Sequence, residues 1–246
     1  MKDTYISFTT HQARVRRIGP MLSSLLKQWP ADRVILTVAH NLELPDFIKA
    51  SGIRIVRSAD YGAFKKHSPL YVDLGIKQYI VADDDSIFPS GWFGNLLNWS
   101  GKLAGQVVCG RGRIWKAKNT LHYPDSRVIH AEHITEPVSC HIYVGIGTAL
   151  FRTDFFETDV FPFPKSGFTY SDDIWFSAKL KDSVKIYVIP YSKEENRETL
   201  GRPKELEYAE ENNCLWKTAR ANDYAGWDAA LRNHRSKIIR LTQREA

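Results

Sequence analysis

The sequence predicts an α/β fold: a mixed, mainly parallel central sheet flanked by helices, in a single domain. Two observations support this class. Apolar, strand-like runs alternate with helical segments along the first half of the chain, as they do in βαβ units. In addition, the apolar run 79–82 ends directly in three aspartates, Asp83, Asp84 and Asp85. Open α/β sheets bind ligands beyond the carboxyl ends of their strands, so this junction also marks the expected site.

The elements of the first half follow in order. Strands are predicted at 5–8, 34–38, 53–56 and 79–82. Helices are predicted at 14–28, 44–50, 69–75 and 92–99. The segment 14–28 carries its apolar residues at helical spacing on one face, and Ser51-Gly52 ends the second helix. Strands joined by such helical crossovers are expected to pair in parallel.

The second half is less regular. Strands are predicted at 106–115, 141–151 and 185–189, and a helix at 174–180. The polar segment 116–137 receives no assignment. The charged segment 192–213, with Gly201 and Pro203, is typical of a mobile loop, and a basic helix is expected from Ala229 onward.

Bulk composition narrows the class of protein. The 246 residues are 43% hydrophobic and 25% charged, which is enough to bury a core. No apolar run reaches the about 18 residues that cross a membrane, and the N-terminus shows no secretory signal, so we expect a cytoplasmic protein. The three cysteines lie at wide spacing without a zinc or disulfide pattern, so we expect mostly buried, reduced thiols.

The formal charge of +6 favours anionic partners such as nucleotides, anionic lipid or acidic glycans. Nucleic acid is not expected as a partner, since no zinc-finger or RNP-like motif is present. The tail from Leu231 mixes basic and apolar residues, and two interpretations stay open. It is either a helix packed on the domain through Leu231, Ile238 and Leu241, or a peripheral contact with the inner face of an anionic membrane.

The aspartate triplet is the strongest functional signal. Carboxylates a few ångströms apart repel one another, and a divalent cation removes that cost. Oxygen ligands suit Mg²⁺ or Mn²⁺. The alternative is a solvated turn in which the aspartates cap the next helix, although Ser86 and Ser90 are able to do this alone.

A second acid pair, Asp172-Asp173, precedes the predicted helix 174–180. Carboxylates are favoured at a helix N-terminus, so two capping residues are the alternative here as well. Aromatic neighbours, including Tyr170 and Trp175, indicate an apolar wall instead of open solvent. A carboxylate in such surroundings can be tuned to take the proton of an attacking hydroxyl group.

Four segments resemble, in the right order, motifs of bacterial, family 2-like glycosyltransferases of the GT-A fold. They are ISFTTHQARVRRIGPMLSSLLKQ (6–28), Asp60-Tyr61-Gly62 with Lys66, YIVADDDSIFP (79–89) as a DXD motif, and SDDIWFSAKL (171–180). The resemblance covers about residues 4–190. It implies metal-dependent transfer of a sugar from a nucleotide-diphosphate sugar to a glycan or lipid-linked acceptor, with inversion, as in polysaccharide biosynthesis.

On this basis we expect a GT-A catalytic domain at 1–190, with a nucleotide-binding half at 1–100 and an acceptor half at 101–190. A charged loop and basic helical tail follow at 191–246.

The resemblance also implies roles for the acids. Asp85 is expected as the direct ligand of Mn²⁺ or Mg²⁺, with Asp83 as the second acid of the metal site, facing the ribose or base. Asp84 supports both. Asp173 is expected as the general base, and Asp172 as a contact to an acceptor hydroxyl group.

Donor contacts are expected from both ends of the nucleotide-binding half. Thr9 and Thr10 end the first strand, where they can hold a nucleoside. Arg14 matches a family arginine that pairs with pyrophosphate or stacks on the base. Lys66 matches the family lysine in the loop that Asp60 opens.

Several other residues have weaker signals. Lys65 is expected as surface charge. Gly147, in the segment 145–148, is a candidate contact to the donor sugar or acceptor, although such glycines are also ordinary in crowded strands. His141 and His234 are candidates for a third metal ligand, but lone histidines are more often structural. Tryptophans 92, 115, 175 and 216 are candidate sugar platforms, although most tryptophans are core residues.

Two alternatives to a sugar transferase stay open. A nucleotidyltransferase would use the same metal site, but a glycine-rich basic loop is expected after its first strand, where this chain has Thr9-Thr10-His11-Gln12. A Walker-type loop is also absent. A non-catalytic protein that binds nucleotides or anionic glycans has no need of the Asp172-Asp173 pair.

Overall fold

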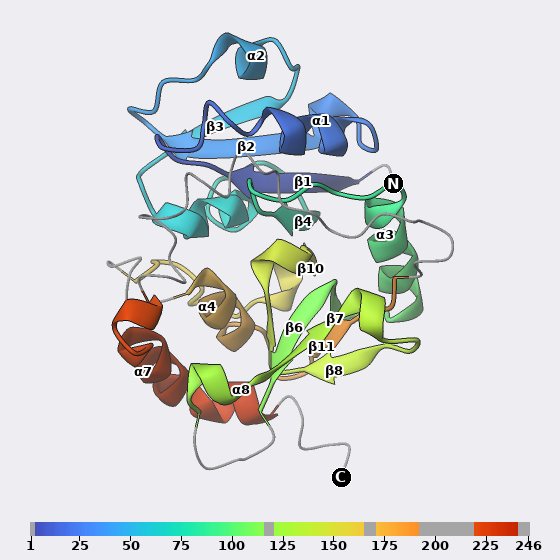
Figure 1. Ribbon diagram of the computed structural model, residues 1–246, viewed down its shortest axis with the longest axis vertical. Helices are drawn as coiled ribbons and strands as arrows, with labels where there is room; N and C mark the ends of the chain where they lie inside the picture. Colours follow the sequence, from blue (N-terminus) through green and yellow to red (C-terminus); the bar gives the residue numbers. More distant parts are fainter. Residues whose placement is uncertain (1–2, 116–120, 165–170, 192–218, 241–246) are drawn as a thin grey trace.

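The structure is a computed structural model that describes residues 3–115, 121–164, 171–191 and 219–240 (Figure 1). Within these residues the main sheet has eight strands. Their spatial order is β3 (Arg54–Ser58), β2 (Val34–Ala39), β1 (Thr4–Thr9), β4 (Gln78–Ala82), β10 (Ala149–Arg152), β5 (Val107–Cys109), β11 (Ile186–Val188) and β8 (Val138–Cys140). A smaller sheet has the order β7 (Arg127–His130), β6 (Arg111–Ile114) and β9 (Ile142–Tyr143).

The first four strands of the chain form the predicted parallel half of the main sheet. Strands β3, β2, β1 and β4 pair in parallel in this order. Strands β2, β1 and β4 are buried almost throughout. Apolar runs without strict alternation suit a parallel sheet that is covered on both faces. Because Phe8 pairs with Ala82, the residues after β1 come to lie beside the aspartates after β4.

One antiparallel strand shapes the site. Strand β10 lies between β4 and β5 and runs antiparallel to both, with Ala149 opposite Val81. The start of β10 therefore meets the carboxyl end of β4. This brings the short 3₁₀ turn η5 (Gly145–Gly147) next to the aspartate triplet.

Helices cover both faces of the main sheet (Figure 1). The α-helices are α1 (Gly19–Leu26), α2 (Asp46–Lys49), α3 (Trp92–Lys102), α4 (Asp172–Ala178), α7 (Ala225–Asn233) and α8 (Arg235–Arg240). The other 3₁₀ segments are η1 (Ala31–Arg33), η2 (Gly62–Leu70), η3 (Tyr123–Asp125), η4 (Ala131–His133) and η6 (Thr153–Phe155). A mixed, mainly parallel sheet with flanking helices confirms the predicted fold class.

Several predicted element boundaries were wrong. The helix expected at 14–28 begins only at Gly19, with Pro20 in its first turn, and the residues before it form turns. Proline is favoured at a helix start because it has no N–H group to leave unpaired. The helix expected at 69–75 is absent from those described residues, because η2 ends at Leu70.

The strands expected at 106–115 and 141–151 are both interrupted. The first divides at Gly110 into β5 and β6, which belong to different sheets. A Cβ atom on Gly110 would lie 2.3 Å from the Trp92 ring and 2.6 Å from the carbonyl oxygen of Gly147. The chain therefore passes here too close to its neighbours for any residue other than glycine. The second strand is broken by η5, and this break supplies part of the site.

Three hydrophobic clusters hold the layers together. One lies under α1 and α3, and a second, rich in aromatic rings, lies on the opposite face of the sheet. The third joins α4 to the C-terminal helices, which lie beside it in Figure 1. Cys109 and Cys140 are buried free thiols, as predicted, whereas Cys214 lies outside the described residues.

The apolar side chains of the C-terminal helices pack inside the protein. Leu231 and Ile238 are fully buried and share the third cluster with Ile174 of α4. Lys237 pairs with Glu157 and Asp182 at 3.0 Å each. Of the two interpretations left open for this tail, the burial of Leu231 and Ile238 favours the helix packed on the domain, and Leu241 lies outside the described residues.

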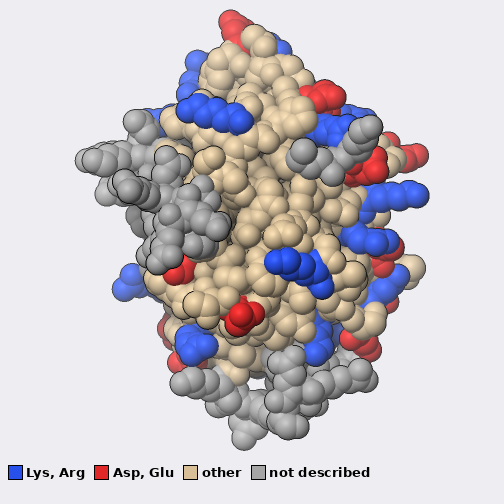
Figure 2. All heavy atoms as spheres, turned by 90° about the vertical axis from the view of Figure 1, so that its right-hand side faces the viewer, with Lys and Arg blue, Asp and Glu red and all other residues tan. Residues whose placement is uncertain are grey.

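Two further observations concern contact with membranes: the distribution of charge on the surface and the length of the helices. On the face in Figure 2, the basic side chains of the described residues are interspersed with acidic ones. Among the described helices, none is long and apolar enough to cross a membrane. The predicted loop 192–213 falls outside the described residues.

Candidate active site

The two acid groups of the sequence meet at one buried lysine. Lys66, in η2, places its Nζ atom 2.7 Å from Asp83 Oδ1 and 2.7 Å from Asp172 Oδ2. Asp83 follows β4, whereas Asp172 begins α4, about ninety positions later in the chain. Lys66 is only 3% exposed. The contacts of Lys66 therefore join the strand-end aspartates and the helix-start pair into one cluster.

The charge of Lys66 is set by its surroundings. Burial lowers its pKa, but the carboxylates of Asp172, Asp83 and Asp173 outweigh burial and hold the pKa well above its usual value. A buried ammonium group is tolerated only when it is paired in this way. Lys66 is therefore a permanent cation in the middle of the acids.

A neutral histidine lies directly after Lys66 in the chain. His67 stacks on Phe176 of α4, with ring centroids 3.4 Å apart, and its ring nitrogens lie 3.0 Å from the hydroxyl groups of Tyr79 and Tyr143. Burial, together with the charge of Lys66, keeps the pKa of His67 well below its usual value. Its contacts connect η2 to β4, β9 and α4, the elements around Lys66.

Arg14 neutralises the other two aspartates. Its Nη1 atom lies 2.7 Å from Asp84 Oδ1 and 3.5 Å from Asp85 Oδ2. Arg14 was expected inside a helix, but it lies in the turn before α1. That turn carries its guanidinium group back to the end of β4. The side chains of both aspartates are less than a tenth exposed.

Asp173 faces the same cluster from the start of α4. The backbone N–H of Gly145 donates a hydrogen bond to its Oδ1 atom at 3.1 Å. Burial and the neighbouring Asp172 raise the pKa of Asp173 well above its usual value, against the opposing effect of Lys66. A raised pKa is the property expected of a carboxylate that takes a proton near neutral pH.

A side chain at position 145 would crowd the acid cluster. A Cβ atom there would lie 2.7 Å from Lys66 Nζ and 2.9 Å from Asp83 Oδ2. The backbone of η5 thus forms a wall of the acid cluster with no room for a side chain. The predicted residue Gly147 has a different neighbour, since its Cβ atom would lie 2.4 Å from Arg111.

We expect Gly145→Ala to disturb the site while the fold persists. The added methyl group has to displace Lys66 or Asp83, and overpacking of this kind typically costs about 1–3 kcal/mol. Chemical denaturation should show this loss relative to Gly94→Ala, where a Cβ atom meets nothing within 4 Å. If both variants are equally stable, the acid cluster accommodates the added methyl group without loss of stability.

The predicted threonines lie at the end of β1. Thr9 donates a hydrogen bond through Oγ1 to the carbonyl oxygen of Thr37 at 2.7 Å. The Oγ1 atom of Thr10 is buried and has no hydrogen-bond partner among the described residues. Thr9 is therefore engaged within the sheet, whereas Thr10 keeps a polar group for another partner.

The prediction for Lys65 was wrong. Lys65 is 2% exposed instead of lying on the surface, and its ammonium group pairs with Asp60. Asp60 also accepts a hydrogen bond from the backbone N–H of Gly62 at 3.1 Å, and its side chain is largely exposed. The short helical turns of η2 turn both lysines inward, which residue type alone does not indicate.

Sequence reasoning missed His11. Partial burial lowers the pKa of His11, and the charges of Asp84, Arg14, Lys65 and Asp60 also act on that pKa. The available signal was its position directly after the strand-end threonines.

The acid cluster suits a divalent cation whose coordination is completed by a ligand. Its donors are carboxylate oxygens, and Asp84 Oδ2 is buried without a hydrogen-bond partner among the described residues, as is Ser86 Oγ. No group of three or more histidine, cysteine or acidic side chains in the described part of the chain is arranged around one metal position. Mg²⁺ and Mn²⁺ sites often use only one or two carboxylates together with substrate phosphates.

The two candidate histidines lie elsewhere. His141 Nδ1 accepts a hydrogen bond from the backbone N–H of Trp115 at 3.0 Å, and burial lowers its pKa to about 4. His234 packs against the ring of Trp175, with centroids 5.6 Å apart. The described contacts place neither beside the aspartate triplet.

The tryptophans are mainly structural. Trp92 and Trp115 are buried, and Trp92 donates a hydrogen bond to Thr148 Oγ1 at 2.9 Å. Trp175 is partly buried and donates to the carbonyl oxygen of Val160 at 3.1 Å. Trp216 lies outside the described residues.

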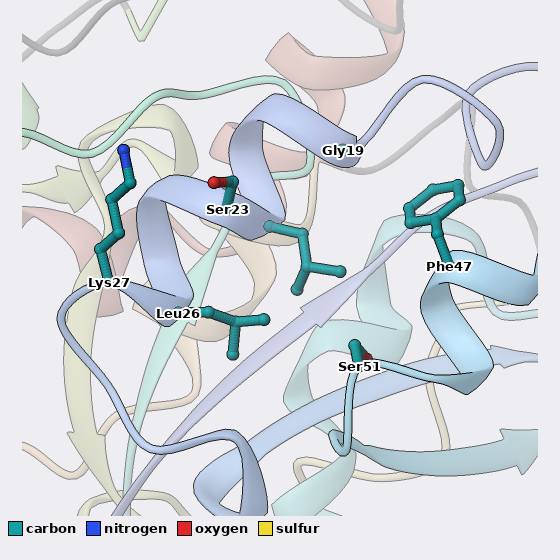
Figure 3. Close-up of a pocket in the computed structure, with 7 residues that line it drawn as sticks. Gly19, Ser23, Leu26, Lys27, Phe47 and Ser51 are labelled. Atoms are coloured by element: carbon teal, nitrogen blue, oxygen red, sulfur yellow. The ribbon is translucent and has the colours of Figure 1, made fainter.

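A hollow of about 390 Å³ lies apart from the acids, between α1 and α2 (Figure 3). Leu22, Leu26, Lys27 and Phe47 are among the residues that line it. None of its lining residues belongs to the carboxylate cluster, so we do not assign it to the site.

Comparison with known proteins supports the fold. No protein-family model and no curated protein sequence matches the chain. Among solved structures, Staphylococcus aureus TarS (residues 1–349) is 14% identical, with a TM-score of 0.49 over 76% of this chain and 60% of that one. GalNAc-T7, solved with UDP, GalNAc and Mn²⁺, is 11% identical, with a TM-score of 0.50 over 76% of this chain and 42% of that one.

The chain thus spans less than two thirds of both structures. The likeness to GalNAc-T7, together with the sheet described above, identifies the fold as GT-A.

Proposed function

We propose that this protein is a glycosyltransferase that moves a sugar from a nucleotide-diphosphate sugar to a glycan or lipid-linked acceptor. The observation that carries the proposal is the pair of contacts from Lys66 to Asp83 and Asp172. These contacts connect two groups of acids. Asp83 belongs to the group suited to a metal and a diphosphate, and Asp172 belongs to the group suited to proton transfer. The GT-A fold adds support, and GalNAc-T7 was solved with a nucleoside diphosphate, a sugar and Mn²⁺.

The donor would bind where β1 and β4 end. Asp85 and Asp83 would hold Mn²⁺ or Mg²⁺, and the metal would neutralise charge on the departing diphosphate. Arg14 and Lys66 are cations that already pair with carboxylates there. A guanidinium and an ammonium group so placed can bind phosphate oxygens when the donor enters. Thr10 can supply its buried hydroxyl group to the nucleoside.

The acceptor would bind on the side of α4. Asp173 takes the proton of the acceptor hydroxyl group as that oxygen attacks the anomeric carbon, and the nucleoside diphosphate leaves. Asp172, beside it, orients the acceptor hydroxyl group. Attack assisted by such a base inverts the anomeric centre. The positive charge of Lys66 favours the ionised form of Asp173 that this step needs.

Nucleotide binding tests the proposal most directly. Isothermal titration with UDP, GDP, CDP and dTDP, each with and without Mn²⁺, should show one diphosphate that binds tightly only with the metal. Hydrolysis of the matching nucleotide sugar should then follow. Binding of nucleoside triphosphates alone, with release of pyrophosphate, would favour the nucleotidyltransferase. Binding without any turnover would favour a non-catalytic protein.

We expect Asp85→Asn to abolish metal-dependent nucleotide binding. The variant removes one negative charge and a hard ligand from the site, while Asn keeps the shape of the side chain. Asp46→Asn is the control, since the side chain of Asp46 is 99% exposed on α2. Titration of Mn²⁺ and nucleoside diphosphate into both variants measures the effect. Wild-type affinity in Asp85→Asn would remove Asp85 from the metal site.

A further inference from the structure

The imidazole ring of His67 is held inside the protein by three aromatic side chains. Its Nδ1 and Nε2 atoms lie 3.0 Å from the hydroxyl groups of Tyr79 and Tyr143, respectively, and the ring stacks on Phe176 with an interplanar angle of 17°. The side chain is fully buried. A neutral imidazole has one N–H donor and one acceptor nitrogen, so it donates a hydrogen bond to one hydroxyl group and accepts one from the other. Both ring nitrogens are therefore satisfied within the protein.

The backbone bends at the same residue. His67 has a φ of −94° and a ψ of 27°, values that are not helical, between the two helical turns that make up η2. The turn before the bend carries Lys66. The residue after it, Ser68, is anchored to β2, because its Oγ atom accepts a hydrogen bond from Thr37 Oγ1 at 2.7 Å. His67 therefore lies where the turn that carries Lys66 is joined to the sheet.

Strand β4 contacts both His67 and Lys66. Tyr79, which contacts the imidazole ring, lies in this strand four residues before Asp83, which pairs with Lys66 Nζ at 2.7 Å. Pairing with β1 on one side and β10 on the other holds the strand in place. A fixed imidazole ring therefore fixes the neighbouring lysine relative to the carboxylate at the end of the same strand.

The other two partners of the imidazole ring show the same correspondence. Tyr143 ends β9 two residues before Gly145, where a Cβ atom would lie 2.7 Å from Lys66 Nζ. Phe176 lies one turn after Asp172 in α4, and residues four apart share a face of a helix. Asp172 pairs with Lys66 Nζ at 2.7 Å. Each of the three elements thus contacts the imidazole ring near one residue that borders the ammonium group.

From this geometry we infer that His67 is a positioning residue, which holds the ammonium group of Lys66 between Asp83 and Asp172. Its effect on transfer rests on the proposed function, whereas the position of the ammonium group does not. A lysine side chain loses considerable rotamer entropy when it is fixed, so a rigid neighbour reduces the freedom that remains. Imidazole suits this role because one flat ring both stacks on Phe176 and forms hydrogen bonds at two of its edges.

NMR of the lysine ammonium group tests the position without any activity. In ¹H–¹⁵N spectra of the full chain, an ammonium group that is buried and ion-paired exchanges its protons slowly enough to give a signal, which is assigned through the side-chain carbons of Lys66. We expect this signal in the wild type and in His67→Gln, because an amide also supplies a donor and an acceptor. His67→Phe should lose it, since phenylalanine keeps the stacking ring but bonds neither hydroxyl group.

Phe93→Leu is the matched control, because Phe93 is fully buried in the hydrophobic cluster under α1 and α3, on the other face of the sheet. It loses core packing but should keep the Lys66 signal. If His67→Phe does not fold, the double variant Tyr79→Phe, Tyr143→Phe replaces it, since it removes both hydroxyl groups and keeps every ring. This double variant should lose the signal too.

Kinetics separates positioning from packing. Misplacement of a catalytic group by about 1 Å can cost on the order of 10²-fold in rate, so His67→Phe should lower kcat about ten- to hundredfold. The KM for the acceptor should change less than about threefold, because His67 lies behind Lys66 and not on the acceptor side of the acids. His67→Gln should restore most of the lost kcat, and Phe93→Leu should keep the wild-type value.

The two measurements distinguish this inference from the proposed function. A wild type that transfers no sugar but shows the expected ammonium signals contradicts the proposed function and leaves the position of Lys66 supported. Three results overturn the inference alone: a wild type without the Lys66 signal, a His67→Phe variant that keeps it, or a Phe93→Leu variant that loses it equally. If His67→Gln behaves as His67→Phe does in both measurements, the two hydrogen bonds do not position Lys66, and the inference is likewise overturned.

Discussion

Asp173→Asn is expected to lose transfer while it keeps donor binding. General-base assistance typically contributes on the order of 10²–10⁴ in rate, so kcat should fall by about that factor. The affinity for the nucleoside diphosphate should change little, since the side chain acts in the transition state. Asparagine also retains the oxygen that accepts the Gly145 N–H group. Steady-state kinetics, together with nucleotide titration, measures the two effects separately.

The same variant should be more stable than the wild type at neutral pH. Burial and Asp172 raise the folded pKa of Asp173 above its unfolded value, so the wild-type carboxylate costs stability once the pH exceeds that unfolded pKa, near 3.9. Asparagine removes this cost. The gain should therefore be present at pH 7 and disappear as the pH falls towards about 4. Urea unfolding at several pH values measures it.

Asp159→Asn is the control for both measurements, because Asp159 pairs with Lys179 at an exposed position. It should keep wild-type kcat and change stability only slightly. Wild-type transfer in Asp173→Asn would reduce Asp173 to a helix cap. A loss of transfer accompanied by loss of folding would leave the carboxylate with a structural role.

Lys66→Met is expected to have the largest effect on stability. Methionine keeps much of the length and the apolar stem, but it removes the cation that Asp83, Asp172 and Asp173 share. Breaking a buried ion pair in this way costs about 3–5 kcal/mol, because the remaining charges are left uncompensated. The free energy of unfolding at pH 7 should fall by that amount, and nucleotide binding should be lost.

The pH dependence identifies the cause of that loss. Lys66 opposes the rise that burial and Asp172 cause in the pKa of Asp173, so this pKa should rise further above its unfolded value of about 3.9 in the variant. A carboxyl group with a raised pKa destabilises the folded state above that unfolded value, so the deficit should shrink as the pH is lowered towards about 4. A deficit that is independent of pH would indicate lost packing instead of lost charge.

Lys179→Met provides the matched comparison. Its ammonium group pairs with Asp159 at 2.6 Å, but the side chain of Asp159 is 71% exposed. Surface pairs contribute about 0–1 kcal/mol, so this variant should lose much less stability at pH 7 than Lys66→Met does. Equal losses in both lysine variants would show that Lys66 has no special role in the acid cluster.

The sequence was sufficient for those features that depend on local order along the chain. Apolar runs alternating with helical spacing predicted the parallel half of the sheet. The run 79–82 correctly placed Asp83, Asp84 and Asp85 at its carboxyl end. Asp172 and Asp173 were predicted directly before a helix at 174–180, and the helix observed there begins two residues earlier, at Asp172. In these cases the signal and the structure lie within a few neighbouring residues.

The local sequence pattern did not predict where helices and strands end when tertiary contacts interrupt them. Gly110 divides a continuous apolar run, because Trp92 and Gly147 leave no space for a side chain there. The first helix begins at Gly19, and the turn before it lets Arg14 reach Asp84. Both outcomes depend on groups that are distant in the sequence.

The sequence by itself determined which residues have the chemistry for a site: two groups of carboxylates, an arginine and a lysine. Only the tertiary structure decided that they share one place, since strand order and the antiparallel strand β10 bring Gly145 and Asp173 against Lys66. It also decided that Lys65 is buried and that the basic tail is packed on α4. The physical reason is that burial and ion pairing depend on partners far along the chain, which local spacing does not specify.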